Sequence, residues 1–198
     1  MFAERKKFFE SLDIHTRRSF LTLAAMAGVS SAVLLADTPF ALAGGSKDGD
    51  IKIMNIALSL EHQAIYAYGV GAETKLLSDG VLKVAVKFME QHKMHRDTLA
   101  ATVKKFGGKP VEASAKYDIV AIAKGVGVSN IATEKDVITL AMKLEDGATK
   151  AYLGVIPNLE NKDVIKAATQ IMADEAIHTA LLRQVLGEDP CPLAFVGA

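Results

Sequence analysis

An internal repeat constrains the fold of this chain more than any other feature of its sequence. The string LEHQAIYAY at 60–68 aligns without gaps with LEDGATKAY at 144–152, at an offset of 84 residues. The two strings share Leu, Glu, Ala, Ala and Tyr at equivalent positions. The sequence therefore predicts two similar halves, each with a carboxylate and a tyrosine in the same order.

A second pair of strings extends the repeat. His92 and His95, in FMEQHKMH, stand 83 residues before Glu175 and His178, in IMADEAIH. Both strings are otherwise rich in residues that favour helices. Four polar positions in register indicate that the two halves carry the same kind of site.

Four long segments have the apolar spacing of amphipathic helices, and a short helix is expected between the second and the third. Glycine and proline at 107–110 end the second segment, and Thr133–Asp136 resembles a capping box that opens the third. Asn161 can cap the fourth, which ends at Gly187. No segment of similar length alternates as a strand would, so we expect an all-α fold. The expected helices cover residues 50–77, 81–106, 117–124, 133–155 and 161–186.

The lengths of the connections predict the topology. Only a few residues join the first helix to the second and the third to the fourth, so the members of each pair must be antiparallel neighbours. The segment 107–132 is long enough to cross the bundle. The chain is therefore expected to form a four-helix bundle made of two antiparallel hairpins joined by a long crossover.

The repeated polar residues share faces of their helices. At about 100° per residue, side chains three positions apart are separated by about 60°, and those seven apart by about 20°. Glu61 thus shares a face with Tyr68, and Glu145 with Tyr152. Apolar neighbours turn these faces inward, which brings three carboxylates and three imidazoles into the core. Unpaired buried carboxylates cost on the order of several kcal/mol each, and two divalent metal ions would offset that cost.

The order of these residues resembles that of the ferritin-like di-iron carboxylate bundles, which include rubrerythrin-like proteins. In these bundles two helices supply one Glu each and the other two supply Glu-x-x-His. The resemblance covers nearly all of residues 50–187. It implies that the terminal ligands are Glu61 and Glu145, the bridging ligand is Glu175, and the imidazole ligands are His95 and His178.

The chain departs from the family pattern at position 92, where a second bridging Glu is expected and this chain has His92. Glu90 does not replace it, because a spacing of five from His95 turns its side chain about 140° away. The six residues remain suitable ligands for Fe, Mn, Zn or Cu. Three outcomes stay open: two metal ions with one carboxylate bridge, a single metal ion, or a degenerate site without turnover.

Two classes of function follow from the resemblance. In the first, two Fe or Mn ions react with peroxide or dioxygen, with Tyr68 and Tyr152 either packing as ordinary core aromatics or taking part beside the metal ions. The electrons must come from a separate donor, because the single cysteine, Cys191, excludes a rubredoxin-type module. In the second class, the bundle binds or stores metal, or serves as a structural subunit, without catalysis. A homodimer is expected if an apolar helix face is exposed. The formal net charge of zero argues against a nucleic-acid partner.

Residues 1–43 resemble a twin-arginine export signal. Two arginines at 17–18 precede Phe20 and a long uncharged run, and ALA at 41–43 resembles a cleavage site. Proteins exported by this pathway are typically already folded, often around a cofactor, which agrees with a metal site. Cleavage would leave a ferritin-like domain at 44–198 in the periplasm, whereas a retained signal would serve as a single membrane anchor.

Overall fold

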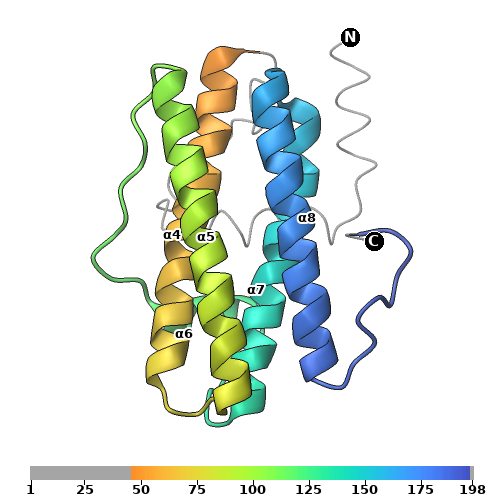
Figure 1. Ribbon diagram of the computed structural model, residues 1–198. Coiled ribbons are helices and arrows are strands. Elements are labelled where there is room, and N and C mark those ends of the chain that lie inside the picture. The colour runs from red at the N-terminus through yellow and green to blue at the C-terminus, as the bar shows by residue number, and fades with distance from the viewer. Residues whose placement is uncertain (1–45, 197–198) are drawn as a thin grey trace.

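The computed structural model describes residues 46–196 as a bundle of helices (Figure 1). The predicted export signal at 1–43 lies outside these residues. The all-α prediction is confirmed, since this part of the chain contains no strand, and the helix bounds differ from the predicted ones by a few residues. None of these helices combines the length and the apolar character needed to cross a bilayer. The elements are α4 (Lys47–Glu73), α5 (Asp79–Lys105), α6 (Ile119–Gly125), α7 (Glu134–Val155), the 3₁₀ helix η1 (Ile156–Asn158) and α8 (Lys162–Val185).

Side-chain caps set the first residues of three long helices. Ser46 accepts a hydrogen bond from a backbone N–H in the first turn of α4, and Asn161 does the same for α8. Thr133 and Asp136 form the predicted capping box at the start of α7, in which each side chain accepts from the backbone of the other. Beyond the end of α8, Gly187 adopts a φ of 74°, a left-handed conformation that favours glycine.

The helices form two antiparallel hairpins, as the connection lengths predict. The helices α4 and α5 form one hairpin, and α7 and α8 form the other (Figure 1). The hairpins pack with α4 beside α7 and α5 beside α8. The crossover between α5 and α7 carries the short helix α6. Residues from all four long helices therefore face a common interior.

A buried carboxylate joins the two hairpins at one end of the bundle. Asp50, in the first turn of α4, is 1% exposed. Its two oxygens accept hydrogen bonds from the backbone nitrogens of Glu160 and Asn161, at 3.1 and 2.9 Å. These nitrogens precede α8, so the start of α4 is tied to the start of the last helix.

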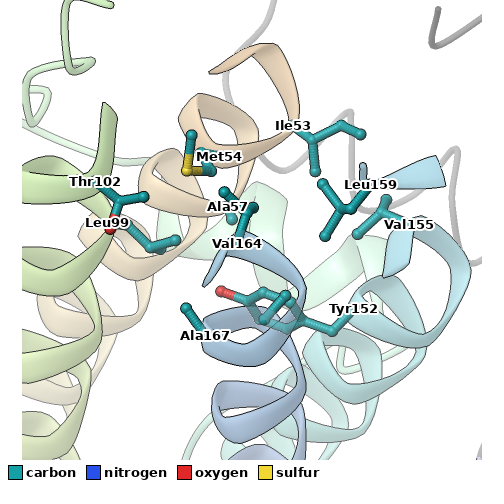
Figure 2. Close-up of a pocket in the computed structure, with 11 residues that line it drawn as sticks. Ile53, Met54, Ala57, Leu99, Thr102, Tyr152, Val155, Leu159, Val164 and Ala167 are labelled. Carbon is teal, nitrogen blue, oxygen red and sulfur yellow. The ribbon is translucent and has the colours of Figure 1, made fainter. Parts of the chain in front are cut away.

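Of three apolar clusters among the described residues, one packs α7 against the crossover, and the other two lie along the bundle with the polar residues of the repeat between them. Of these two, the first surrounds Met54 and Leu99 near the start of α4, and the second surrounds Phe88 and Leu182 toward the opposite end. In the first cluster, side chains from α4, α5, α7 and α8 enclose a cavity of only about 10 Å³ (Figure 2). That volume is at the lower limit for one water molecule, so this end of the core is tightly packed.

Candidate metal centre

The structure brings together all six residues for which the sequence predicts a metal-binding role. Each long helix contributes to the cluster, and the side chains of five of the six are almost fully buried, whereas that of His95 is 13% exposed. The contributions are Glu61 from α4, His92 and His95 from α5, Glu145 from α7, and Glu175 and His178 from α8. Their ligand atoms form two overlapping groups, each with atoms within 4.8 Å of one another.

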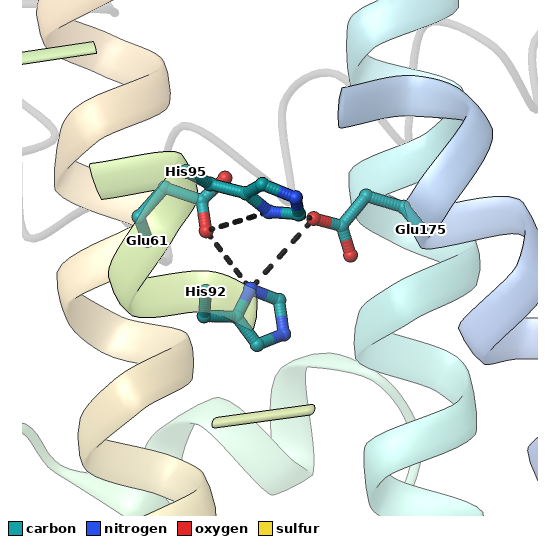
Figure 3. Close-up of side chains that lie close together, drawn as sticks. All are labelled: Glu61, His92, His95 and Glu175. Carbon is teal, nitrogen blue, oxygen red and sulfur yellow. Dashed lines mark hydrogen bonds and ion pairs between the residues drawn. The ribbon is translucent and has the colours of Figure 1, made fainter. Parts of the chain in front are cut away.

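The first group consists of Glu61, His92, His95 and Glu175 (Figure 3). Oε2 of Glu61 lies 2.8 Å from Nδ1 of His92 and 3.7 Å from Nδ1 of His95. Oε1 of Glu175 lies 3.2 Å from Nδ1 of His95 and 3.7 Å from Nδ1 of His92. Two imidazole nitrogens and two carboxylates thus converge from three helices.

The second group consists of His92, Glu145, Glu175 and His178. Nε2 of His92 lies 3.2 Å from Oε1 of Glu145. Nδ1 of His178 lies 3.5 Å from Oε2 of Glu145 and 3.6 Å from Oε2 of Glu175. His92 and Glu175 therefore belong to both groups, and the imidazole of His92 turns one ring nitrogen toward each.

The donor set fits metal ions, because several buried atoms in it make no hydrogen bond. Nδ1 of His95, Nδ1 of His178 and both carboxylate oxygens of Glu175 are buried and make no hydrogen bond among the described residues, although they lie at ion-pair distances of 3.2 and 3.6 Å from one another. Buried polar atoms are normally paired, since an unpaired one costs about 1–3 kcal/mol. These four atoms all point into the two groups, where nitrogen and oxygen are suitable ligands for Fe, Mn or Zn.

The imidazoles and carboxylates of the cluster shift one another's pKa values. Burial alone would lower the pKa of His92, but the charge of Glu145 and hydrogen bonds raise it well above its usual range. Burial would likewise lower the pKa of the other two imidazoles, but carboxylate partners raise the pKa of His95 to about 10 and that of His178 to about 9. Without metal, all three imidazoles are therefore protonated near pH 7.

The three carboxylates differ from one another. Burial favours the neutral form of each, but hydrogen bonds and charges from the imidazoles lower the pKa of Glu61 and lower that of Glu145 well below its usual range. Burial, together with the charge of Glu145, raises the pKa of Glu175 to about 7. The metal-free cluster is thus nearly neutral overall, with Glu175 holding a proton part of the time at neutral pH.

The comparisons with known proteins agree with this architecture. A family model described as the ferritin-like domain matches residues 49–188. The chain belongs to this family. It is similar to a conserved hypothetical protein from Mycobacterium tuberculosis, with 26% identity, a TM-score of 0.61, and coverage of 76% of this chain and 99% of that one. Its fold also matches a bacterioferritin-related protein from Bacteroides fragilis, described as a dodecameric thioferritin, at 23% identity and a TM-score of 0.59 over 73% and 88% of the two chains. No curated protein matches.

The tyrosines of this ferritin-like domain support carboxylates on the opposite hairpin. The hydroxyl of Tyr68 on α4 donates to Oε1 of Glu145 on α7. The hydroxyl of Tyr152 on α7 donates to Oε1 of Glu61 on α4, at 3.1 Å. The sequence places each tyrosine on the same face as the carboxylate of its own helix, but the hydrogen bonds cross between the hairpins.

Three side chains hold the imidazoles in place, a role that the sequence analysis did not assign to them, although helix geometry puts Asp174 near the direction of His178, as a possible substitute ligand, and Gln91 on the face of His95. Nε2 of His95 lies 3.2 Å from Oδ2 of Asp174, and Nε2 of His178 lies 3.2 Å from Oε1 of Gln91. The ring of Phe88 stacks on His178 with centroids 3.9 Å apart. With Nε2 held in this way, each histidine presents Nδ1 to the cluster. Asp174 and Gln91 each lie one helical turn from a histidine, at spacings of four, which is the signal that could have indicated them.

Proposed function

We propose that this ferritin-like domain binds two Fe or Mn ions at the six clustered residues and reacts with peroxide or dioxygen, using electrons from a separate donor. The observation that carries the proposal is the set of four buried ligand atoms without hydrogen bonds, in two groups that share His92 and Glu175. When bound, the two ions supply coordination positions at which an oxidant is reduced. A single ion or Zn is the alternative filling of the same site.

The residues around the centre have defined tasks in this proposal. Tyr68 and Tyr152 hold Glu145 and Glu61 in fixed orientations through their hydroxyl groups. The cluster is buried within the bundle, which strengthens every charge interaction inside it. Glu175, whose pKa is raised by burial to about 7, can hold or release a proton at a carboxylate oxygen near neutral pH before metal binds.

A second candidate function, metal binding or storage without catalysis, is favoured by His92. Its ring nitrogens pair with Glu61 and Glu145 at 2.8 and 3.2 Å, so the protonated imidazole neutralises carboxylates that a metal ion would otherwise neutralise. Two divalent ions bring four positive charges against three carboxylates, whereas a fourth carboxylate would balance them. The site of this chain thus holds two ions less strongly than a site with the fourth carboxylate of the family pattern.

Elemental analysis of the protein purified from the cells that make it tests both proposals. About two Fe or Mn ions per chain, together with oxidation of a donor by peroxide or dioxygen, would support the oxidoreductase. Retained metal without such a reaction would support the binding protein. Glu145→Gln should lower the metal content, and Glu160→Gln, at an exposed position, should leave it unchanged. No metal in the unaltered protein, even after incubation with excess Fe or Mn, would contradict both proposals.

We also propose that the protein acts in the periplasm after export by the twin-arginine pathway. Support comes from the arginines at 17–18, the uncharged run that follows and the ALA string at 41–43. Replacing both arginines with lysine should keep the protein in the cytoplasm with an uncleaved N-terminus. Cell fractionation and the mass of the purified chain would decide this, and an unchanged location in the variant would contradict it.

A homo-oligomer is proposed from an apolar stripe on α8. Ile177, Leu181 and Val185 follow one another at spacings of four and are 55%, 41% and 46% exposed. A second copy of the same chain would cover this stripe. Light scattering should show that Leu181→Lys lowers the mass of the assembly. The same mass for the unaltered protein and for Leu181→Lys would exclude this stripe as the interface.

A further inference from the structure

A cavity of about 120 Å³ lies on the other side of the cluster from the tightly packed core. Its walls come from α4, α5, α7 and α8 and from the crossover, including α6. Most of the lining side chains are apolar, as Ile122 on α6 and Leu140 on α7 illustrate. An apolar cavity of about 150 Å³ is large enough for benzene, so this one has room for a ligand of similar size.

The space exists because the sequence places small residues along the two helices that face it. Ala64, Ala67 and Gly71 line the cavity from α4, and Ala141 and Ala148 line it from α7. These positions lie at helical spacings of three, four and seven, so each set shares one face. Larger apolar side chains there would fill the cavity and bury more surface, which would normally stabilise the fold.

The cavity borders the proposed metal centre. His92 and Glu145, which belong to the second ligand group, are part of its wall, and so is Tyr68, which donates to Glu145. A molecule in the cavity would therefore lie beside the second ligand group.

One buried polar group on the wall lacks a partner. Gln63 on α4 is 5% exposed, and its Nε2 donates to the backbone oxygen of Ser59 at 3.5 Å. Its Oε1 is buried and makes no hydrogen bond with any described residue. An unpaired buried acceptor is unfavourable, and a ligand with an O–H or N–H donor would pair it.

We propose that this cavity binds a small apolar molecule with a single hydrogen-bond donor, of the size of phenol. The apolar body would lie between the small residues of α4 and α7, and the donor would bond to Oε1 of Gln63. Binding itself requires no metal. Only a reaction of the bound ligand at the metal centre would rest on the proposed function.

Calorimetric titration of the purified protein with phenol and with benzene tests this inference, because the two probes differ by one hydroxyl. Phenol should bind saturably to both the metal-free and the metal-loaded protein. Ala67→Leu, which fills the cavity, should abolish binding, whereas Ala101→Leu, at an exposed position on α5, should not. Thermal unfolding of both variants verifies that they fold. Absence of saturable phenol binding, or unchanged binding to Ala67→Leu, would overturn the proposal.

A second variant tests the hydrogen bond to Gln63. Gln63→Met replaces the amide with an apolar side chain of similar length, and it should weaken phenol binding about fivefold, the effect of one hydrogen bond, without weakening benzene binding. An equal change for both probes would overturn the assignment of the donor. Protein that binds phenol but never loads metal would refute the proposed function and leave the cavity assignment standing.

Discussion

The hydroxyl of Tyr152 donates a hydrogen bond to Oε1 of Glu61, at 3.1 Å, and so links α7 of one hairpin to α4 of the other. Tyr68 makes the equivalent bond to Glu145 in the opposite direction. The internal repeat of the sequence thus appears in the structure as an exchange between two halves, in which each supports the carboxylate of the other.

Removing one of these hydroxyls should destabilise the metal-free bundle. Tyr152→Phe leaves a buried oxygen of Glu61 without its partner, so we expect the free energy of unfolding to fall by about 1–3 kcal/mol. Urea denaturation of metal-free protein measures this change. Tyr66→Phe, at a half-buried position whose ring contacts Tyr117, serves as the control. Similar losses in both variants would show that the bond to Glu61 contributes nothing specific.

The stability of the metal-free protein should decrease as the pH rises above neutral. Carboxylate partners raise the pKa of His95 to about 10 and that of His178 to about 9 in the folded state, above the usual value near 6.5. Their contribution is therefore complete below about pH 6.5 and is lost as the pH rises through about 9 and 10. The midpoint of urea denaturation, measured between about pH 6 and pH 10, should fall over this range and so tests the expectation.

Two of the carboxylates change the stability of the fold with pH in the opposite direction, at acid pH. The imidazoles lower the pKa of Glu61 and Glu145, so the contribution of these groups is present above their unfolded pKa of about 4.5 and is lost as the pH falls through the lower folded values. Glu175, with its pKa raised to about 7, favours the folded state at low pH and loses that contribution as the pH rises through 7. Maximal stability is thus expected in mildly acidic solution, and a maximum at pH 9 would contradict the charge assignment.

Metal binding should release protons. The imidazoles of His92, His95 and His178 carry protons near pH 7 without metal because carboxylates raise their pKa, and a metal ion must displace these protons. We expect release of about three to four protons per chain at pH 7, because Glu175 also gives up the proton that it holds part of the time, and tighter binding as the pH rises toward 9. Calorimetry with Mn in buffers of different ionisation enthalpies counts the protons. Binding that is independent of pH would mean that the imidazoles are not ligands.

Restoring the carboxylate at position 92 should affect the two states of the protein in opposite directions. Without metal, His92→Glu replaces a buried cation with a fourth carboxylate, and we expect a loss of about 3–5 kcal/mol in the free energy of unfolding. With Fe or Mn, the added charge should increase metal retention and recover the stability. Unfolding of each variant with and without metal separates the two effects. A loss that persists at saturating metal would indicate disrupted packing.

Asp174 should contribute to metal affinity without being a ligand in either group. Its Oδ2 lies 3.2 Å from Nε2 of His95 and 3.6 Å from Nε2 of His178, on the side of both rings away from the cluster. Asp174→Asn should weaken metal binding about 10-fold to 100-fold, as the loss of such partners does elsewhere. Asp163→Asn, at an exposed site, should not change it. Equal affinities for the two variants and the unaltered protein would show that Asp174 does not position the histidines.

Much of this arrangement follows from residue spacing. Helical periodicity and connection lengths predicted the two hairpins and the crossover, and spacings of three predicted that His95 and His178 would each share a face with a second polar residue. The partners of Tyr68 and Tyr152 could not be predicted, because spacing defines a face of a helix but not which neighbouring helix the hydroxyl reaches. The cavity was also missed, since alanines such as Ala64 and Ala67 are common in helices and reveal empty space only once the opposite wall is known.

The bond between Asp50 and the backbone before α8 has a consequence for how the bundle moves. It fastens the hairpins together at the end where the core is tightly packed, whereas the cavity occupies the far end. Fluctuations that separate α4 from α7 should therefore pivot about Asp50 and be widest near the turn between α4 and α5. This separation of the helices would admit a solute to the cavity without disturbing the end that Asp50 holds together. Amide exchange should therefore be slow near Met54 and faster near Gly71.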